Sequence, residues 1–533
     1  MQVISTKVLI VGAGPCGVTI ANHLGMYGVD TIIVDREDDI IPYPRAVGID
    51  DEALRGYQTV GLVDVLLKDM IQNTAARYHT SRGRLFAEVQ PQAQPFGWPR
   101  RNLFIQPLTE TTLRKGLERY ACVRMMLGLD AINLEQGAEG VSVTVRDAAG
   151  QETTIKADYV VGADGGRSTI RQLIGVELRG ETYADRWLVV DLKDDHLYAP
   201  YSAVYCDVKR PSMSIDLPYG HRRFEFRLAA DETDEEMQSP ENVERLLDKF
   251  YPEGTPRPTL LRSRVYLHHT RVADRFKVGR VFLAGDAAHL QPPFFGQGMN
   301  SGLRDVTNLG WKLAGVVKGQ LKPAVLDSYD VERRDHALTM VNVAKMFGVL
   351  YSPRSRLTEA LRDIFFRLIQ GLPSVRDYIL QMKFKPLPRY TEGIVVPRDG
   401  MEKDGPVGRM LPQPFVETAE GRRVRLDDAI GNWFAIIGVN RDPQAALSPA
   451  VRDRWLAMGG VFVRINRSRA HPDAKQVLDG TIVLDDVAGA FRDWSLRLPD
   501  AQCILLRPDR YVSAICTEHA LDATADELVR LVA

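Results

Sequence analysis

Three glycine-containing stretches of this chain have residue types and spacings that could bind a ligand. They are GAGPCG at residues 12–17, DGGRSTIR at 164–171 and GDAAHLQPPFFGQGMN at 285–300. The third follows the apolar run 281–284 and carries two prolines and three glycines. An ordinary connection between elements needs only a handful of residues. This loop is therefore expected to hold something in place.

The first stretch has the chemistry of a phosphate-binding turn. In a G-x-G-x-x-G pattern, Gly12 allows the tight turn, Gly14 lets a pyrophosphate approach the backbone, and Gly17 lets helix and strand pack closely. The helix that follows offers free N–H groups and partial positive charge to the phosphates. Asp35, 23 residues after Gly12, can accept hydrogen bonds from a ribose and argues against a 2′-phosphate there. Either NAD or FAD satisfies this pattern, and a glycine-rich turn without a ligand is the alternative.

The elements around this turn form a predicted βαβ unit. Residues 7–11 and 31–34 are β-branched runs typical of strands, and 18–27 has the apolar spacing of a helix. Strand-like segments recur between about 180 and 275, which predicts a mostly antiparallel second lobe. Residues 299–390 are mainly helical in pattern, 395–414 is a Pro/Gly-rich linker, and the remainder predicts a small separate α/β domain. The predicted fold class is therefore α/β, with domains at 1–180 plus 276–395, at 181–275 and at 396–533.

Composition excludes several other classes of protein. The 533 residues correspond to roughly three domains. A net charge of -1 gives no electrostatic basis for binding nucleic acid or an anionic membrane. No apolar run reaches the ~18 residues of a membrane span, and the N-terminus lacks the pattern of a secretory signal. The five cysteines form neither a C-x-x-C motif nor a Cys/His cluster at metal spacing. We therefore expect a reduced, cytoplasmic protein without a metal site.

Taken together and in this order, the three stretches resemble the group A flavoprotein aromatic monooxygenases, the family of p-hydroxybenzoate hydroxylase and phenol hydroxylase. The resemblance covers about residues 5–390. Three further stretches, at 41–55, 96–107 and 329–337, resemble the subgroup that acts on 3-(3-hydroxyphenyl)propionate. The segment LLRPDRYVSAI resembles the closing strand pair of the thioredoxin-like domain found in phenol hydroxylase-like members, although this chain has no C-x-x-C there. We interpret that domain as structural or as an oligomer contact.

The resemblance implies FAD as cofactor in a Rossmann-like domain, with NADH or NADPH as co-substrate. A single G-x-G-x-x-G unit indicates that NAD(P)H docks without its own Rossmann domain. The implied reaction is the ortho-hydroxylation of a small phenol by molecular oxygen through a flavin C4a-hydroperoxide, and related enzymes are commonly homodimers. The expected FAD contacts are Gly12, Ala13, Gly14, Pro15, Cys16, Gly17, Asp35, Arg36, Arg45, Gln106, Leu129, Asp164, Asp286, Pro293, Gly296, Gln297, Gly298, Met299 and Asn300.

Candidates for ring chemistry are fewer. A phenol has a pKa of ~10, so a base near its hydroxyl would activate the ring. Asp50 and His268 are candidates for that base, and Pro292 belongs to the wall expected beside the flavin ring. His289 is interpreted as structural. A substrate carboxylate needs a cation, and the lobe offers Arg210, Arg222 and Arg223.

Other interpretations remain open for each group. Asp164 and Asp286 could simply cap helices, and the arginines could face solvent. Another phenol, resorcinol-like or a polyketide ring, is an alternative substrate. From other classes, a flavin-dependent reductase and an FAD-binding assembly protein remain alternatives. A flavin halogenase is disfavoured because W-x-W-x-I-P is absent.

Overall fold

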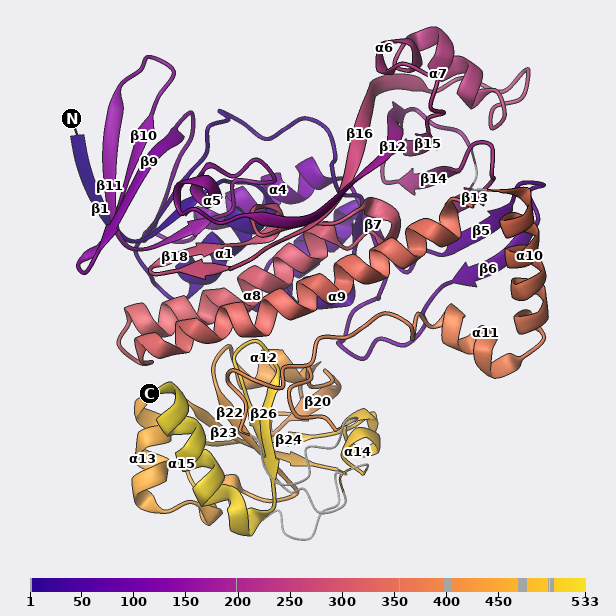
Figure 1. Cartoon of the computed structure of the whole chain (residues 1–533). Helices are drawn as coiled ribbons and strands as arrows, with labels where there is room; N and C mark the ends of the chain where they lie inside the picture. Colours follow the sequence, from indigo (N-terminus) through magenta and orange to yellow (C-terminus); the bar gives the residue numbers. More distant parts are fainter. Residues whose placement is uncertain are drawn as a thin grey trace.

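The computed structural model describes residues 2–197, 199–353, 355–396, 405–467, 477–496, 498 and 503–533. Part of the predicted linker, 397–404, lies outside the described residues. Figure 1 shows two β-sheet regions joined by long strands, two long helices running beneath them, and the C-terminal part below the helices.

The first sheet contains the predicted βαβ unit. β1 (Gln2–Val11) pairs in parallel with β2 (Thr31–Val34), and α1 (Pro15–Met26) crosses between them. The sheet order is β17-β18-β11-β1-β2-β8, and a β9–β10 hairpin extends from β11. The remaining bounds are β8 (Val123–Met126), β9 (Asp130–Gly137), β10 (Gly140–Arg146), β11 (Glu152–Gly162), β17 (Lys277–Val278) and β18 (Val281–Leu283). Its central strands are apolar because they are covered on both faces. α1 begins earlier than predicted because Pro15 suits the first helical turn.

The second sheet has the order β19-β16-β12-β15-β14-β13-β5-β6. Its bounds are β5 (Ala76–Thr80), β6 (Leu85–Val89), β12 (Leu178–Lys193), β13 (Ser202–Cys206), β14 (Ser212–Leu217), β15 (His221–Arg227), β16 (Thr259–Ala273) and β19 (His289–Leu290). Every pairing is antiparallel except β13 with β5. The β5–β6 hairpin comes from outside the segment 181–275. The second sheet therefore includes two strands from the N-terminal part of the chain.

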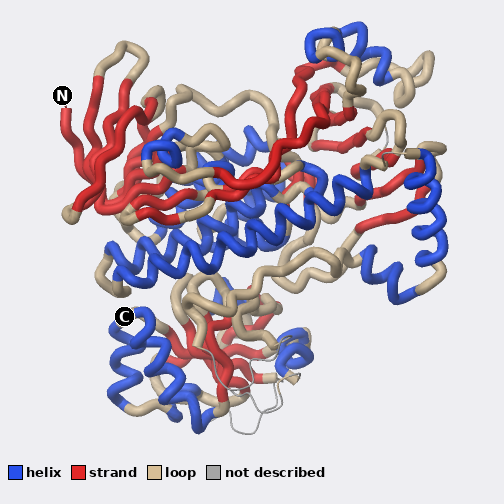
Figure 2. The backbone as a smooth tube through the Cα atoms, viewed as in Figure 1, coloured by secondary structure: helices blue, strands red, loops and turns tan. Residues whose placement is uncertain are grey.

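Short elements connect the two sheets. A three-stranded sheet joins β3 (Gly48–Ile49), β7 (Asn102–Phe104) and β4 (Met70–Ile71). The short helices are α2 (Asp51–Thr59), α3 (Val63–Leu66), α4 (Gln106–Leu117), α5 (Thr169–Leu173), α6 (Asp234–Met237) and α7 (Pro240–Leu247). Figure 2 shows helices packed along the first sheet and at the far end of the second.

Most of the region 299–390 is helical, as the pattern predicts, but its last part, 381–390, forms turns and an irregular segment instead. The helices are α8 (Gly298–Val317), α9 (Ser328–Tyr351), α10 (Arg356–Gln370) and α11 (Pro373–Leu380). On α8, the apolar residues Leu303, Val306, Leu309 and Leu313 are buried in the main core. The helix is thereby fixed with its N-terminus between the two sheets.

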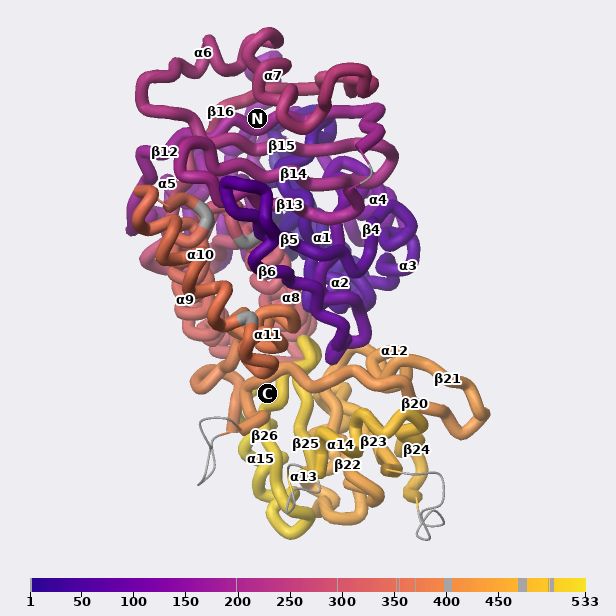
Figure 3. Tube along the Cα trace, turned by 90° about the vertical axis from the view of Figure 1, so that its right-hand side faces the viewer, coloured from indigo at the N-terminus to yellow at the C-terminus, as the bar shows by residue number. Residues whose placement is uncertain are grey.

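The C-terminal part is a mixed sheet between helices, which is the α/β arrangement that the sequence predicts. Its sheet order is β21-β20-β24-β23-β22-β25-β26. Its elements are β20 (Phe415–Thr418), β21 (Arg423–Arg425), α12 (Leu426–Ile430), β22 (Ala435–Val439), α13 (Pro449–Ala457), β23 (Val461–Asn466), β24 (Thr481–Asp485), α14 (Ala490–Ser495), β25 (Cys503–Leu506), β26 (Val512–Cys516) and α15 (Leu521–Val532). Figure 3 shows it as a distinct layer under α8 and α11. Trp311 of α8 packs edge-on against Phe434 of this domain, so the two parts share apolar contact.

Among the helices that the structure describes, none is both long and apolar enough to cross a lipid bilayer.

Candidate active site

A cavity of about 450 Å³ extends from the carboxyl ends of β1, β2 and β11 to the face of the second sheet. This volume is typical of a small-molecule site. In open α/β sheets, ligands bind at the carboxyl ends of the parallel strands. All three glycine-containing stretches contribute to its lining.

The glycine turn at 12–17 is built for a ligand at one position and for packing at two others. Gly12 has φ +105, and a Cβ there would lie 2.4 Å from the carbonyl oxygen of Ala163. A Cβ on Gly17 would lie 1.8 Å from the carbonyl oxygen of Gly12. A Cβ on Gly14 would meet nothing within 4 Å, because that position faces the cavity. Gly14 therefore leaves room for a ligand to approach the start of α1.

Asp35 holds this turn from the next strand. Its Oδ2 accepts a hydrogen bond of 2.5 Å from the backbone N–H of Ala13, and the residue lines the cavity. Asp35 thus fixes the turn at the place where a ribose is expected.

The loop 285–300 presents the carboxylate of Asp286 to the cavity and is held from behind by a buried carboxylate of α8, Asp305. Asp286 lines the cavity, and burial by the surrounding protein raises its pKa. Asp305 accepts hydrogen bonds from the N–H of Gly285 at 3.1 Å and from Nε of Arg333 at 2.9 Å, and its Oδ2 lies 2.7 Å from Nε2 of His289. His289 is fully buried in this network. Its side chain is held by Asp305 and is not part of the cavity lining, which supports the structural role that the sequence predicts.

The N-terminus of α8 forms a wall of the cavity. Residues 296–300 line it, and a Cβ on Gly296 or Gly298 would meet nothing within 4 Å. Asn300 fixes the wall: its Nδ2 donates to the carbonyl of Gly296 at 2.8 Å, and its Oδ1 accepts from the N–H of Asp50 at 3.1 Å. The first N–H groups of a helix have no partner within the helix and favour a nearby anion.

The DGGRSTIR stretch joins the other two. Asp164 lines the cavity, and its Oδ2 accepts from the N–H of Ile170 at 3.1 Å. Its Oδ1 is buried and has no hydrogen-bond partner among the described residues. Arg171 donates to the carbonyls of Ala287 at 3.0 Å and Gly166 at 2.9 Å, which ties this stretch to the loop 285–300. The unpartnered oxygen of Asp164 is the kind of group that a polar ligand satisfies.

Gln106 secures the loop that carries Arg45. Its Oε1 accepts from the backbone N–H groups of Arg45 at 3.1 Å and Ala46 at 2.7 Å, and its Nε2 donates to Glu110 at 2.7 Å. Gln106 and Arg45 both line the cavity.

Most of the expected cofactor residues meet at this cavity. Its lining includes Gly12, Gly14, Pro15, Cys16, Asp35, Arg36, Arg45, Gln106, Leu129, Asp164, Asp286, Pro293, Gly296, Gln297, Gly298, Met299 and Asn300. Ala13 and Gly17 lie behind the lining, where they shape the turn. The open glycines, the unsatisfied Asp164 oxygen and the free end of α8 fit a flat cofactor with a pyrophosphate and a ribityl chain.

The other half of the cavity, called the apolar chamber below, is largely apolar and suits an aromatic ring. It lies against the second sheet and the segment that follows α11. Its apolar lining is Ala76, Tyr78, Val89, Val204, Met213, Ile215, Phe294, Met382 and Phe384.

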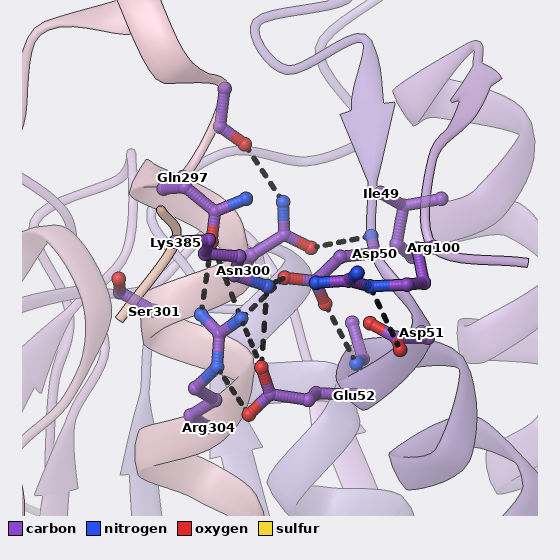
Figure 4. Close-up of polar contacts among 12 residues, drawn as sticks. Ile49, Asp50, Asp51, Glu52, Arg100, Gln297, Asn300, Ser301, Arg304 and Lys385 are labelled. Carbon is purple, nitrogen blue, oxygen red and sulfur yellow. Dashed lines mark hydrogen bonds and ion pairs between the residues drawn. The ribbon is translucent and has the colours of Figure 1, made fainter. Parts of the chain in front are cut away.

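Asp50 is part of a buried ion-pair network and is not free to act as a base. Its Oδ1 caps α2 by accepting from the N–H of Ala53 at 3.0 Å, and its Oδ2 accepts from Arg304 and from Nζ of Lys385, the latter at 2.7 Å. Burial alone would raise the pKa of Asp50, but these two cations hold it well below its ordinary value. Figure 4 shows Asp50 and Glu52 facing Arg304 and Lys385. The carboxylate borders the cavity, but both of its oxygens are already engaged.

His268 and Pro292 are not among the residues that line the cavity. His268 is buried with its ring 5.6 Å from that of Trp187 and 5.0 Å from that of Phe294. Burial, together with the neighbouring His269, lowers the pKa of His268 to about 3. Its ring packs edge-on against that of Phe294, which does line the cavity. Pro292 immediately precedes the single helical turn Pro293–Phe295 and sets its start.

Of the three arginines expected to bind a carboxylate, the structure brings only Arg223 to the cavity. Arg210 pairs with Glu232 at 2.9 Å, and Arg222 is buried against Asp195 at 2.5 Å. Arg223 pairs with Asp191 at 2.8 Å and donates to the carbonyls of Arg45 and Pro44. Arg223 thus positions the loop that carries Arg45.

Sequence reasoning did not single out Arg100, Arg101, Glu225 or Lys385. The first three line the cavity, and Lys385 pairs with Asp50, which also lines it. The two-residue alternation along β15 could have identified Glu225, because it shares a sheet face with Arg223. Nothing local in the sequence marks Lys385, whose partners lie more than 330 residues away.

Comparison with known proteins agrees with this geometry. Residues 5–344 match the family model described as "FAD binding domain", and residues 408–531 match "HcaD C-terminal domain". A 3-(3-hydroxy-phenyl)propionate/3-hydroxycinnamic acid hydroxylase of Burkholderia cenocepacia is 49% identical over 96% of this chain and 93% of its own length. A protein of the same name from Mycobacterium avium is 42% identical over 98% of this chain and 91% of its own.

Solved structures share the fold. The flavin-dependent monooxygenase PieE, crystallised with FAD and substrate, superposes with a TM-score of 0.81 over 99% of both chains at 21% identity. The p-nitrophenol 4-monooxygenase PnpA of Pseudomonas putida DLL-E4 gives a TM-score of 0.66 over 72% of this chain and 98% of its own, at 26% identity.

The fold and cavity thus define an FAD-dependent aromatic monooxygenase. Within that class, the chain belongs to the family of 3-(3-hydroxyphenyl)propionate/3-hydroxycinnamic acid hydroxylases.

Proposed function

We propose that this chain hydroxylates 3-(3-hydroxyphenyl)propionate, or a close analogue, at the carbon next to the phenolic hydroxyl, using NADH or NADPH and molecular oxygen. The observation that carries the proposal is a continuous cavity, with cofactor motifs at one end and an apolar chamber at the other. The choice of substrate is supported by a hydroxylase named for this compound, which is 49% identical to this chain over nearly its whole length.

The FAD-binding residues proposed here are those that line the cavity. Gly14 would leave space for the pyrophosphate, Asp35 would hold the ribose, Asp286 would hold the ribityl chain, and residues 296–300 would border the flavin ring. When bound, FAD accepts a hydride from NAD(P)H and supplies activated oxygen. The side chains of the chamber orient the substrate ring and exclude water from it.

Arg101 is the proposed partner of the substrate carboxylate. It lines the cavity beside β5 and β13, where it donates to Ser202 Oγ at 3.0 Å and to the carbonyl of Ala75 at 2.8 Å. These contacts hold the guanidinium in one place at the edge of the chamber. A positioned guanidinium binds a carboxylate through charge-assisted hydrogen bonds.

A substrate panel tests the proposal. Purified enzyme with FAD is assayed for NAD(P)H oxidation and catechol formation with 3-(3-hydroxyphenyl)propionate, 3-ethylphenol, 3-phenylpropionate and resorcinol. We expect efficient turnover of the first compound and a higher KM for 3-ethylphenol, which lacks the carboxylate. Arg101→Met should raise KM about tenfold or more for the carboxylate substrate, the equivalent of ~1.4 kcal/mol, and should leave KM for 3-ethylphenol unchanged. Arg84→Met, at an exposed arginine near the same sheet, is the control. Preferred turnover of resorcinol would refute the substrate assignment.

The proposed architecture is a Rossmann-like FAD domain at 1–180 and 276–395, a substrate lobe at 181–275 and a thioredoxin-like domain at 396–533. The order β23-β22-β25-β26, with β22 parallel to β23 and antiparallel to β25, supports the last assignment. All five cysteines are free thiols, which supports a reducing compartment such as the cytoplasm.

A homodimer is also proposed. α10 exposes an apolar stripe formed by Leu357, Leu361, Ile364, Phe365 and Leu368, and such a stripe is typical of a contact surface. Sedimentation of wild type and of the double variant Leu361→Lys/Ile364→Lys tests this. A monomeric wild-type protein would refute it.

A further inference from the structure

Glu225 on β15 is a buried carboxylate that faces the chamber. Only 4% of the residue is exposed, and it lines the cavity. Its Oε2 is buried and has no hydrogen-bond partner among the described residues. Buried polar atoms are nearly always hydrogen-bonded, and one without a partner calls for an explanation.

The neighbours of Glu225 leave it available to a ligand. Its partners across the sheet are Met213 on β14 and Val189 on β12, and neither side chain can donate a hydrogen bond. Arg223 lies two residues earlier on the same face, but its guanidinium is engaged by Asp191 and by the carbonyls of residues 44 and 45. Glu225 therefore presents a hydrogen-bond acceptor in an apolar space shaped for a ring.

Neither residue first considered as the base is available for that role. Both oxygens of Asp50 accept hydrogen bonds within the ion-pair network. His268 lies behind Phe294 and outside the lining. Of the candidate bases considered, Glu225 is thus the one with a carboxylate available at the end of the cavity that lies against the second sheet.

We propose that Glu225 accepts the proton of the substrate's phenolic hydroxyl, and that this contact selects a hydroxylated ring and activates it. The inference rests on the proposed function, since it assumes a phenolic substrate. In the step, the phenol O–H bond breaks and a carboxyl O–H bond forms, so a neutral phenol and a carboxylate become a phenolate and a carboxylic acid. The electron pair stays on the phenolic oxygen and enriches the ring at the ortho carbon. No oxidant is consumed in this step.

Electrostatics agree with the geometry. Burial raises the pKa of Glu225, opposed by Arg223 and assisted by Asp191. A base works best when its pKa lies near the operating pH. The raised pKa of Glu225 is therefore closer to the pKa of the phenol that it must deprotonate.

The test compares wild type with Glu225→Gln, which keeps the size of the side chain but cannot take a proton. We expect the variant to retain FAD and to bind substrate, but to form catechol about 10²- to 10⁴-fold more slowly. NAD(P)H oxidation should continue and yield hydrogen peroxide instead of product. A more acidic fluorinated analogue of the same phenol should recover part of the lost rate. Ultraviolet difference spectra of bound ligand should show phenolate character in wild type and less of it in the variant.

Glu88→Gln is the matched control, because Glu88 lies on β6 of the same sheet and pairs with Arg77 outside the chamber. It should behave as wild type. Catechol formation by Glu225→Gln at the wild-type rate, with an unchanged pH profile, would overturn the role of Glu225. If wild type instead hydroxylates a different phenol, the substrate assignment fails, and the same pair of variants measured on that phenol still decides the role of Glu225. If wild type turns over no phenol at all, both proposals fail, whereas loss of the role of Glu225 alone leaves wild-type hydroxylation intact.

Discussion

The ammonium nitrogen of Lys385 lies 2.7 Å from Oδ2 of Asp50 and 3.2 Å from Oε1 of Glu52. This contact joins the segment after α11 to the start of α2. Met382 and Phe384, both within three residues of Lys385, line the chamber. Arg304 of α8 pairs with the same two carboxylates, so three distant parts of the chain meet behind one wall of the site (Figure 4).

Lys385→Met should loosen that wall. Removing one partner of a buried ion pair costs about 3–5 kcal/mol because the remaining charge is left uncompensated. Arg304 still faces both carboxylates, so we expect the lower end of that range, together with a raised KM for substrate. Urea unfolding and steady-state kinetics measure the two effects. Lys383→Met is the control, because Lys383 pairs with Asp377 at an exposed site, where such pairs contribute ~0–1 kcal/mol. Equal effects of the two variants would contradict the role assigned to Lys385.

Two glycines of the first turn should respond differently to alanine. Gly14→Ala adds a methyl group facing the cavity at a backbone φ of -74, which any residue adopts. The FAD-free protein should unfold at the wild-type urea midpoint, while the Kd for FAD rises about tenfold or more, or ~1.4 kcal/mol. Gly17→Ala places its Cβ 1.8 Å from the carbonyl oxygen of Gly12, so the FAD-free protein itself should be destabilised. Unchanged FAD binding by Gly14→Ala would place the pyrophosphate elsewhere.

Asp51 predicts a pH dependence of stability. Burial, with help from the charges of Asp50 and Glu52 and against that of Lys385, raises the pKa of Asp51 from 3.8 to about 7. The folded state therefore holds this proton more tightly than the unfolded state does. Ionisation of Asp51 therefore does not lower the free energy of unfolding below pH 3.8, and it lowers that free energy increasingly as the pH rises to about 7.

Asp51→Asn should remove that effect. The free energy of unfolding of the variant, relative to wild type, should increase between pH 4 and 7 by at most ~1.4 kcal/mol per pH unit. Denaturant titrations across this range measure it. Asp158→Asn, at an exposed carboxylate, controls for the change in net charge. A difference between Asp51→Asn and wild type that stays constant with pH would show that Asp51 does not titrate there.

Glu332 should be essential to the contact with the C-terminal domain. Its carboxylate accepts two hydrogen bonds of 2.7 Å from Arg507 and one of 2.7 Å from Lys312, all fully buried. Glu332→Gln leaves two buried cations short of negative charge, so we expect a loss of about 3–5 kcal/mol. Thermal and urea unfolding followed by circular dichroism test this, with the exposed Glu420→Gln as control. A wild-type unfolding midpoint would show that Asp509 alone balances Arg507.

Features encoded in adjacent residues were predictable from the sequence. The βαβ unit, the turn at 12–17 and the loop at 285–300 depend on glycines, prolines and apolar runs that act locally. The course of α8 follows from its apolar spacing. These elements place most of the expected cofactor residues at the cavity.

Charged residues of the lobe were harder to place, because pairing partners are set by tertiary structure. Arg210 and Arg222 have the right chemistry for a carboxylate, but Glu232 and Asp195 already neutralise them. Asp50 has the right position for a base, but Lys385 reaches it from the far end of the helical region. The β5–β6 hairpin joins the second sheet through a parallel pairing with β13 that no local pattern indicates.

Helix α8 touches the ligand cavity with its first turn and the C-terminal domain with its later turns. Asn300 borders the cavity, whereas Asn308 and Lys312 contact Glu332, which binds Arg507. Chimaeric enzymes made by exchanging the C-terminal domain between relatives will therefore inherit compatible charges only when both parents agree at positions 308, 312, 332, 507 and 509. Where they differ, unmatched buried charges at this contact are expected to disturb α8, and through its first turn the wall of the ligand cavity.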